Sequence, residues 1–188
     1  GSGCRANSVS TNFNGDRTIL TLIFNDFIAN FGPGIPAQQN RRFCKVDLKM
    51  KVPKGWTFQV NTVDWRGYID LDRGVRGSLA SSYFWSASRG DQVINLYHQT
   101  NIHKQIEGPV HDSYLKHKDG EKDKAVWLPC TTTESVLNIN TAVRLSRSNG
   151  NNNNGPGVQS NNAAKGSITV DSIDAKFKQV LNLGWKKC

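Results

Sequence analysis

The stretch Cys44–Val52, which reads CKVDLKMKV, decides the fold, because its apolar and charged residues alternate without a break. Every second position is apolar, ending at Val52, and the positions between them carry Lys or Asp. Successive side chains of a β-strand point to opposite faces of the sheet, so this pattern is typical of a strand with one buried and one wet face. The stretch therefore predicts an amphipathic strand of an antiparallel sheet.

The same alternation recurs on both sides of this strand. After Pro53-Lys54-Gly55 it resumes in Trp56–Val60, which predicts a second strand joined to the first by a hairpin or a tight corner. Another clear strand is Leu137–Leu145. Turn residues separate the remaining candidate strands, which are Ser8–Thr11, Thr18–Phe24, Trp65–Leu71, Ser82–Ala87, Ile168–Ile173 and Lys178–Trp185.

Helical patterns are scarce. Only Asp91–Thr100 fits a short helix, and it fits a strand as well. Three polar or glycine-rich stretches are expected to be loops: Phe31–Asn40, Glu107–Lys124 and Asn149–Asn162. Many strands with turns between them predict an all-β fold, an antiparallel two-sheet β-sandwich, with a closed barrel as the alternative. The length of 188 residues fits one domain over residues 1–188.

Four cysteines bear on where the protein works. An even number in a chain of this size suggests two disulfides and therefore an oxidising, extracellular location, although buried reduced cysteines are the alternative. Three pairings are possible. We favour the nested one, because the ends of a domain often lie close in space. It joins Cys4 to Cys188 and Cys44 to Cys130.

The net charge of +9 attracts anions such as acidic polysaccharide. Three lysines on one face of the predicted strand Cys44–Val52 can bind an anionic polymer, or they can guard an edge strand against aggregation. Nearby aromatic residues can stack on sugars, although core packing is the alternative. The candidate anion- or glycan-binding residues are Lys45, Lys49, Lys51, Arg66, Trp65 and Tyr68.

Enzyme signatures are absent from the sequence. It holds no glycine-rich phosphate loop, nucleophile elbow or HExxH motif. Asp64, Asp70 and Asp72 share one predicted strand face, as a glycosidase pair or a calcium site would require, but pairing with Arg66 and Arg73 is the simpler interpretation. We therefore predict no enzymatic activity, no cofactor and no metal.

Other functional classes find no support either. The four histidines are expected in solvated loops rather than in a zinc site; they are His98, His103, His111 and His117. No recognition helix or RNP-type motif indicates specific nucleic-acid binding. No apolar run approaches the ~20 residues that span a bilayer.

Six short motifs, in order along the whole chain, point to a known family. They are GSGC (Gly1–Cys4), RFC (Arg42–Cys44), VPKGW (Val52–Trp56), DWRGY (Asp64–Tyr68), LNINT (Leu137–Thr141) and WKKC (Trp185–Cys188). Together they resemble the small secreted, mostly fungal proteins grouped as domain of unknown function forty-three-sixty. The resemblance implies secretion, two disulfides and a β-rich fold, and supplies no catalytic residues. The Asn-rich stretch 149–162 and the strong positive charge depart from the family pattern.

These observations predict a secreted, disulfide-stabilised, non-enzymatic protein. Its expected role is binding or structural, at a cell surface, in an extracellular matrix or at a host interface, with an anionic polysaccharide or another cell-surface component as partner. One alternative is an extracellular structural protein that self-associates by adding strands at an exposed edge. The other is a hydrolase that uses the clustered aspartates.

Overall fold

The computed structural model describes residues 1–89, 92–119, 127–148, 163–169 and 177–188. Across these residues the chain is almost entirely β-strand, and the one helical segment is a single 3₁₀ turn, Ala37–Asn40. The strands are β1 (Val9–Phe13), β2 (Ile19–Phe24), β3 (Ala29–Phe31), β4 (Arg41–Lys51), β5 (Trp56–Leu71), β6 (Val75–Arg89), β7 (Gln92–Glu107), β8 (Val110–Asp119), β9 (Glu134–Arg147), β10 (Gly166–Thr169) and β11 (Phe177–Lys187).

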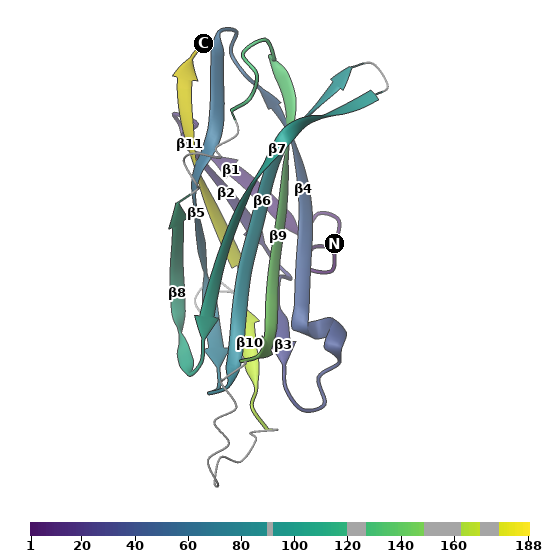
Figure 1. The fold of residues 1–188 in the computed structure, drawn as a ribbon, viewed down its shortest axis with the longest axis vertical. Helices are drawn as coiled ribbons and strands as arrows, with labels where there is room; N and C mark the ends of the chain where they lie inside the picture. Colours follow the sequence, from purple (N-terminus) through teal and green to yellow (C-terminus); the bar gives the residue numbers. More distant parts are fainter. Residues whose placement is uncertain (90–91, 120–126, 149–162, 170–176) are drawn as a thin grey trace.

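The strands form two antiparallel sheets that pack face to face (Figure 1). Sheet A has the order β1-β2-β11-β5-β10-β3, and its seventh strand, β8, also pairs with β5. Sheet B has the order β4-β9-β6-β7. The predicted all-β, two-sheet sandwich is therefore confirmed, and the barrel alternative is wrong because the sheets remain separate.

Aromatic side chains fill much of the space between the sheets. The rings of Phe24, Phe27 and Phe177 lie with centroids 5.0 to 5.5 Å apart, and none of these side chains is exposed. Phe58 contacts the rings of Trp85 and Trp185, each at a centroid distance of 4.5 Å. Burying a large apolar side chain contributes about 1.5–3 kcal/mol, so this layer is a major source of stability.

A buried polar network joins the two sheets within this core. Gln179 of β11 donates hydrogen bonds to Ser81 Oγ at 2.7 Å and to the Tyr83 hydroxyl at 2.5 Å. Its Oε1 accepts a hydrogen bond from Thr141 at 2.6 Å, and Trp65 Nε1 donates to Ser81 at 3.2 Å. Burial raises the pKa of Tyr83, because the phenolate would lose its hydration. Each buried polar side chain in this network has a partner, as a stable interior requires.

All four cysteines form disulfides, but the nested pairing is wrong. The observed bonds are Cys4–Cys44 and Cys130–Cys188. The reason is the length of β4. Cys44 lies near its start, whereas the Cys188 amide donates to the carbonyl of Gly55, just beyond its end. Seven residues of extended strand from Cys44 to Lys51 already span about 24 Å, so the two ends of the chain lie far apart.

The first four residues form a strap along the free edge of β4. The Gly3 amide donates to the Phe43 carbonyl at 2.8 Å, and the Phe43 amide donates to Ser2 Oγ at 3.3 Å. The Cys4–Cys44 disulfide fastens this strap. Part of an edge that would otherwise expose unpaired backbone groups is therefore covered.

Several local expectations change in the structure. Pro53–Gly55 forms a corner rather than a hairpin, because β4 and β5 belong to different sheets. The predicted loop Glu107–Lys124 contains the strand β8, whose polar sequence suits its place at the edge of sheet A, next to β5. In the ambiguous stretch Asp91–Thr100 the strand interpretation is confirmed by β7. The predicted Asn-rich loop lies outside the described residues, as does the second half of Ile168–Ile173.

Candidate functional site

The lysine row, Lys45, Lys49 and Lys51, lies on the outer face of β4, the edge strand of sheet B. All three side chains are exposed, because the even positions of β4 turn toward the core. Asp47 lies between Lys45 and Lys49 on the same face, and its carboxylate is 3.2 Å from Lys45 Nζ. The prediction that the three lysines share one open strand face is confirmed.

The strand register extends this face across the whole of sheet B. Paired residues of β4, β9, β6 and β7 form three cross-strand ladders, and within each strand the ladder positions are two residues apart, so they share the outer face. The ladders are Arg41–Arg144–Ser78–Gln105, Phe43–Ala142–Ala80–His103 and Lys45–Asn140–Ser82–Asn101.

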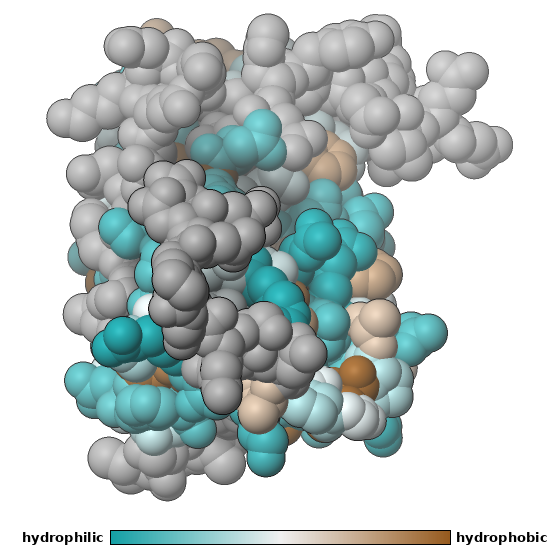
Figure 2. All heavy atoms as spheres, turned by 60° about the horizontal axis from the view of Figure 1, so that its bottom comes forward, coloured by the Kyte–Doolittle hydropathy of each residue, from teal (hydrophilic) through white to brown (hydrophobic). Residues whose placement is uncertain are grey.

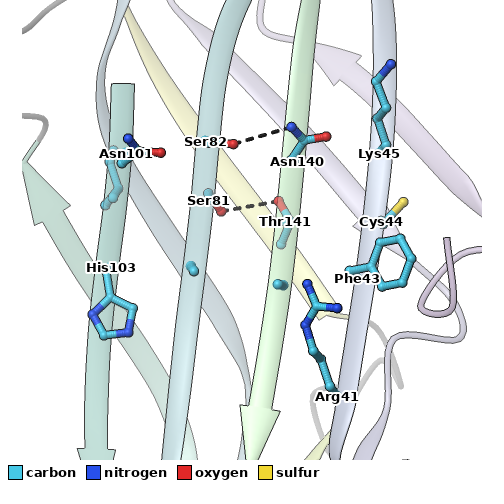
Figure 3. Close-up of a pocket in the computed structure, with 13 residues that line it drawn as sticks. Arg41, Phe43, Cys44, Lys45, Ser81, Ser82, Asn101, His103, Asn140 and Thr141 are labelled. Atoms are coloured by element: carbon cyan, nitrogen blue, oxygen red, sulfur yellow. Dashed lines mark hydrogen bonds between the residues drawn. The ribbon is translucent and has the colours of Figure 1, made fainter. Parts of the chain in front are cut away.

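A groove of about 460 Å³ lies over the middle of these ladders (Figure 3). Its depth comes from Ala80 and Ala142, which are too small to fill the space between longer neighbours. Figure 3 shows Arg41, Phe43 and Lys45 projecting from β4 at one end, and Asn101 and His103 from β7 at the other. Among the described residues, those that line the groove include two cations, two amides and several hydroxyls, and no carboxylate.

Contacts hold several groove side chains in place. The Arg41 guanidinium lies 5.0 Å from the centroid of the Phe43 ring, a cation–π distance. His103 Nε2 lies 2.8 Å from Ser78 Oγ, and Asn140 Nδ2 donates to Ser82 Oγ at 3.4 Å. The groove is therefore partly organised before any ligand arrives.

Exposed apolar surface is limited elsewhere. In the described chain, the large apolar side chains classed as exposed are Phe43, at 42%, and Ile35, at 38%. Figure 2 views the end of the sandwich near β3 and β10, where apolar residues form separate patches among mostly hydrophilic ones. Phe43 is therefore an exception at the groove rather than part of a broad apolar surface.

A carboxylate lies two residues beyond Gln105, the last member of the first ladder, and its charge is balanced by an arginine. Glu107, at the end of β7, pairs with Arg76 and accepts a hydrogen bond from the Ser148 hydroxyl. The Ser148 hydrogen bond, helped by Arg76, lowers the pKa of Glu107. This carboxylate does not line the groove, so the positive character of the β4 side is preserved.

The other predicted binding residues do not join this surface. Trp65 is 0% exposed and belongs to the core, so its assignment to a surface site is wrong. The cause is its odd position in β5, where Val63, Trp65 and Ile69 all turn inward. Arg66 and Tyr68 lie on the outer face of sheet A, on the opposite side of the sandwich from the lysine row.

The aspartate cluster is divided among separate partners. Asp64 lies 3.9 Å from Arg66 Nη2, and Asp70 pairs with His111 of β8. Asp72 accepts a hydrogen bond from the Lys165 amide at 2.7 Å. Asp64 and Asp70 are six strand residues apart, about 20 Å, which exceeds the roughly 5–9.5 Å separation of glycosidase carboxylates. Among the described residues no group of three or more potential metal ligands converges.

The histidines lie on strands rather than in loops. His98 and His103 belong to β7, and His111 and His117 belong to β8. Their sequence neighbours are polar, which suggested loops, but these strands lie at sheet edges, where polar residues are common. His103 lines the groove described above.

Part of the groove consists of residues that were not predicted from the sequence. Phe43 could have been identified, because the alternation of β4 places this large ring among the charged residues of the wet face. Asn101, His103 and Asn140 lie on other strands, and only the cross-strand register brings them to Phe43.

Comparisons with known proteins agree with the resemblance. The family described as a domain of unknown function (DUF4360) matches residues 1–188. The chain is also 34% identical over 188 residues to an uncharacterized secreted protein of Arthroderma benhamiae; the match covers 100% of this chain and 68% of the relative. The chain therefore belongs to the DUF4360 family, and the predicted secretion is confirmed. No helix among the described residues is long and apolar enough to cross a membrane.

Proposed function

We propose that this member of the DUF4360 family is a non-enzymatic binding protein that holds acidic polysaccharide of an extracellular surface against the outer face of sheet B. One observation carries the proposal. The three ladders present Arg41, Arg144 and Lys45, and their twelve side chains include no carboxylate. Lys49 and Lys51 lie further along the same face of β4, beyond Asp47, and Glu134 is the cross-strand partner of Lys51.

The geometry of β4 suits a polymer better than a small anion. Residues two apart on a strand are about 6.8 Å apart, so the outward side chains of β4 are regularly spaced, and four of its six outward positions carry a cation. A polyanion can contact several of these cations at once. Once one anionic group of the polymer is bound, the next group is held nearby at a high effective concentration, so the polymer binds more tightly than a single group does. Because these side chains are exposed, dissolved salt screens their attraction strongly.

The first prediction is that the protein is retained on immobilised polygalacturonate and is released as salt rises. The triple variant Lys45→Gln, Lys49→Gln and Lys51→Gln should elute at clearly lower salt, because it loses the lysine row. The measurement is the sodium chloride concentration at elution.

A charge-matched control separates the lysine row from net charge. Arg5, Lys54 and Lys165 are exposed residues outside sheet B, and changing all three to Gln removes the same three charges. This control should elute close to the wild type. The proposal fails if the two triple variants elute together, or if the wild type is not retained even at low salt.

A further inference from the structure

We infer that the groove is a recognition subsite for a short segment of a uronic-acid chain, lying across the strands from β4 to β7. This inference rests on the proposed function and makes it specific. The lysine row attracts any polyanion, whereas the groove distinguishes a sugar that carries a carboxylate from one that does not.

The shape of the groove sets the path of the ligand. Ala142 and Ala80 are neighbours in the middle ladder, and they form a low floor between Phe43 and His103. Three strand spacings separate these two side chains, about 14 Å in total. A chain of sugar rings therefore fits across the strands, with the Phe43 ring at one end and the imidazole at the other.

The charges of the groove set the direction. Arg41, which lines the groove, and Arg144, its neighbour in the first ladder beside the groove, are directly opposed cross-strand partners, and like charges in such a position repel each other. Among the described residues no carboxylate forms an ion pair with either of them. A ligand carboxylate placed between the guanidinium groups would relieve this repulsion and accept paired N–H donors. Such an anion belongs at the β4–β9 end of the groove.

The rest of the groove suits sugar hydroxyls. The ladder beside the floor offers the amides of Asn140 and Asn101 and the hydroxyl of Ser82. Amide and hydroxyl groups both donate and accept, as the hydroxyl groups of a sugar do. The β7 end offers the Asn101 amide and the His103 imidazole, so it suits the hydroxyl groups at the far end of the sugar segment.

The test is calorimetric titration of the wild-type protein with a short oligogalacturonate and with the same oligomer fully methyl-esterified. The acid should bind at least about tenfold more tightly than the ester, because the ester lacks the carboxylate charge. The double variant Ala80→Gln and Ala142→Gln keeps every charge but fills the floor. It should weaken binding of the acid by about tenfold or more while its thermal unfolding stays that of the wild type.

The matched variant is Lys49→Gln and Lys51→Gln, which removes two charges outside the groove. It should change oligomer binding by less than about threefold, although it weakens retention on the polymer. A measurement without substitutions provides the second line of evidence. In NMR spectra of the wild type, the acid should shift the signals of the His103 imidazole and of the Asn101 and Asn140 side-chain amides.

The possible failures are distinguishable. If polygalacturonate retains the protein but the filled floor leaves oligomer binding unchanged and the His103 signals stay fixed, the groove inference is overturned and the proposed function stands. If acid and ester bind equally, the carboxylate assignment is wrong. If no acidic polysaccharide is retained, the proposed function falls, and the inference falls with it.

Discussion

At the scale of single residues, Gln179 links the two sheets through hydrogen bonds inside the core. It is fully buried on β11 of sheet A, and its partners Ser81, Tyr83 and Thr141 all belong to sheet B. A satisfied polar network inside a core fixes the alignment of the layers, because any sliding leaves buried groups without partners.

The second prediction is that Gln179→Ala destabilises the fold by about 2–4 kcal/mol, since it leaves buried hydroxyls unpaired and opens a cavity. Urea unfolding followed by tryptophan fluorescence gives the free energy of unfolding. The matched control is Gln38→Ala, the same substitution at an exposed position of the 3₁₀ turn, which should change stability by less than about 0.5 kcal/mol. Equal losses in both variants would contradict the structural role of the network.

The residue scale is also where prediction from sequence succeeded least. Trp65 and Phe43 are both aromatic residues next to charged ones, but the Trp65 side chain is buried and the Phe43 side chain is exposed. Position parity within the strand decides this, and parity is readable only when the strand frame is known. The frame of β4 was predicted, so Phe43 could have been placed. The frame of β5 was predicted as well, with Asp64 and Arg66 on one face, and it leaves Trp65 on the opposite, buried face.

At the scale of elements, β4 combines two protections that edge strands use. Charged side chains occupy its wet face, and the strap formed by residues 1–4 covers part of its free edge. Unpaired backbone groups on an edge are the usual starting point for association between sheets. The strap therefore bears directly on the alternative of self-association.

The third prediction concerns Gly3, where an added Cβ atom would overlap the ring of Phe27. Gly3→Ala should push the strap away from β4 and expose its edge, so light scattering should rise with protein concentration. The control is Gly15→Ala, because Gly15 has open space around it. If both variants scatter as the wild type does at every concentration, the strap does not protect the edge.

Elements with strong alternation were predicted well, and those without it were not. The alternating stretches at Cys44–Val52 and Leu137–Leu145 became β4 and β9 because one face of each is buried. The strand β8 was predicted as a loop because its sequence is mostly polar and charged, and its strand conformation depends on pairing with β5. A pairing between residues about 50 positions apart leaves no local pattern to recognise.

At the scale of the whole molecule, the two disulfides act on separate regions. They close segments with sequence separations of 40 and 58 residues. In the loop-closure model each contributes roughly 4 kcal/mol by limiting the unfolded chain, although measured contributions are often smaller. Cys44 and Cys188 lie toward opposite ends of β4, so the two contributions should be independent.

The fourth prediction is that the pair Cys4→Ala and Cys44→Ala lowers the urea midpoint, and that the pair Cys130→Ala and Cys188→Ala does so too. The quadruple variant should lose the sum of the two decreases in the free energy of unfolding, within about 0.5 kcal/mol, because the effects of distant substitutions are usually additive. Unfolding in urea at equilibrium provides the free energies. A quadruple variant as stable as either double variant would show that the two bonds are coupled.

The pairing itself could not be predicted from the sequence. Closeness of the chain ends is a tendency of domains, and here the extended length of β4 outweighs it. The number of cysteines indicated two bonds, but their partners depend on which strand edges meet, and that arrangement is a property of the assembled sheets.

The place of β11 in sheet A determines when this protein can fold. Residues 177–187 lie between β2 and β5, so the β1–β2 hairpin, which is synthesised long before them, has no attachment to β5 until those residues emerge. Sheet A is thus completed only after nearly all of the 188 residues have been synthesised, and such distant pairings form slowly. During secretion the early hairpin must wait, unpaired on that side, for the arrival of its neighbour.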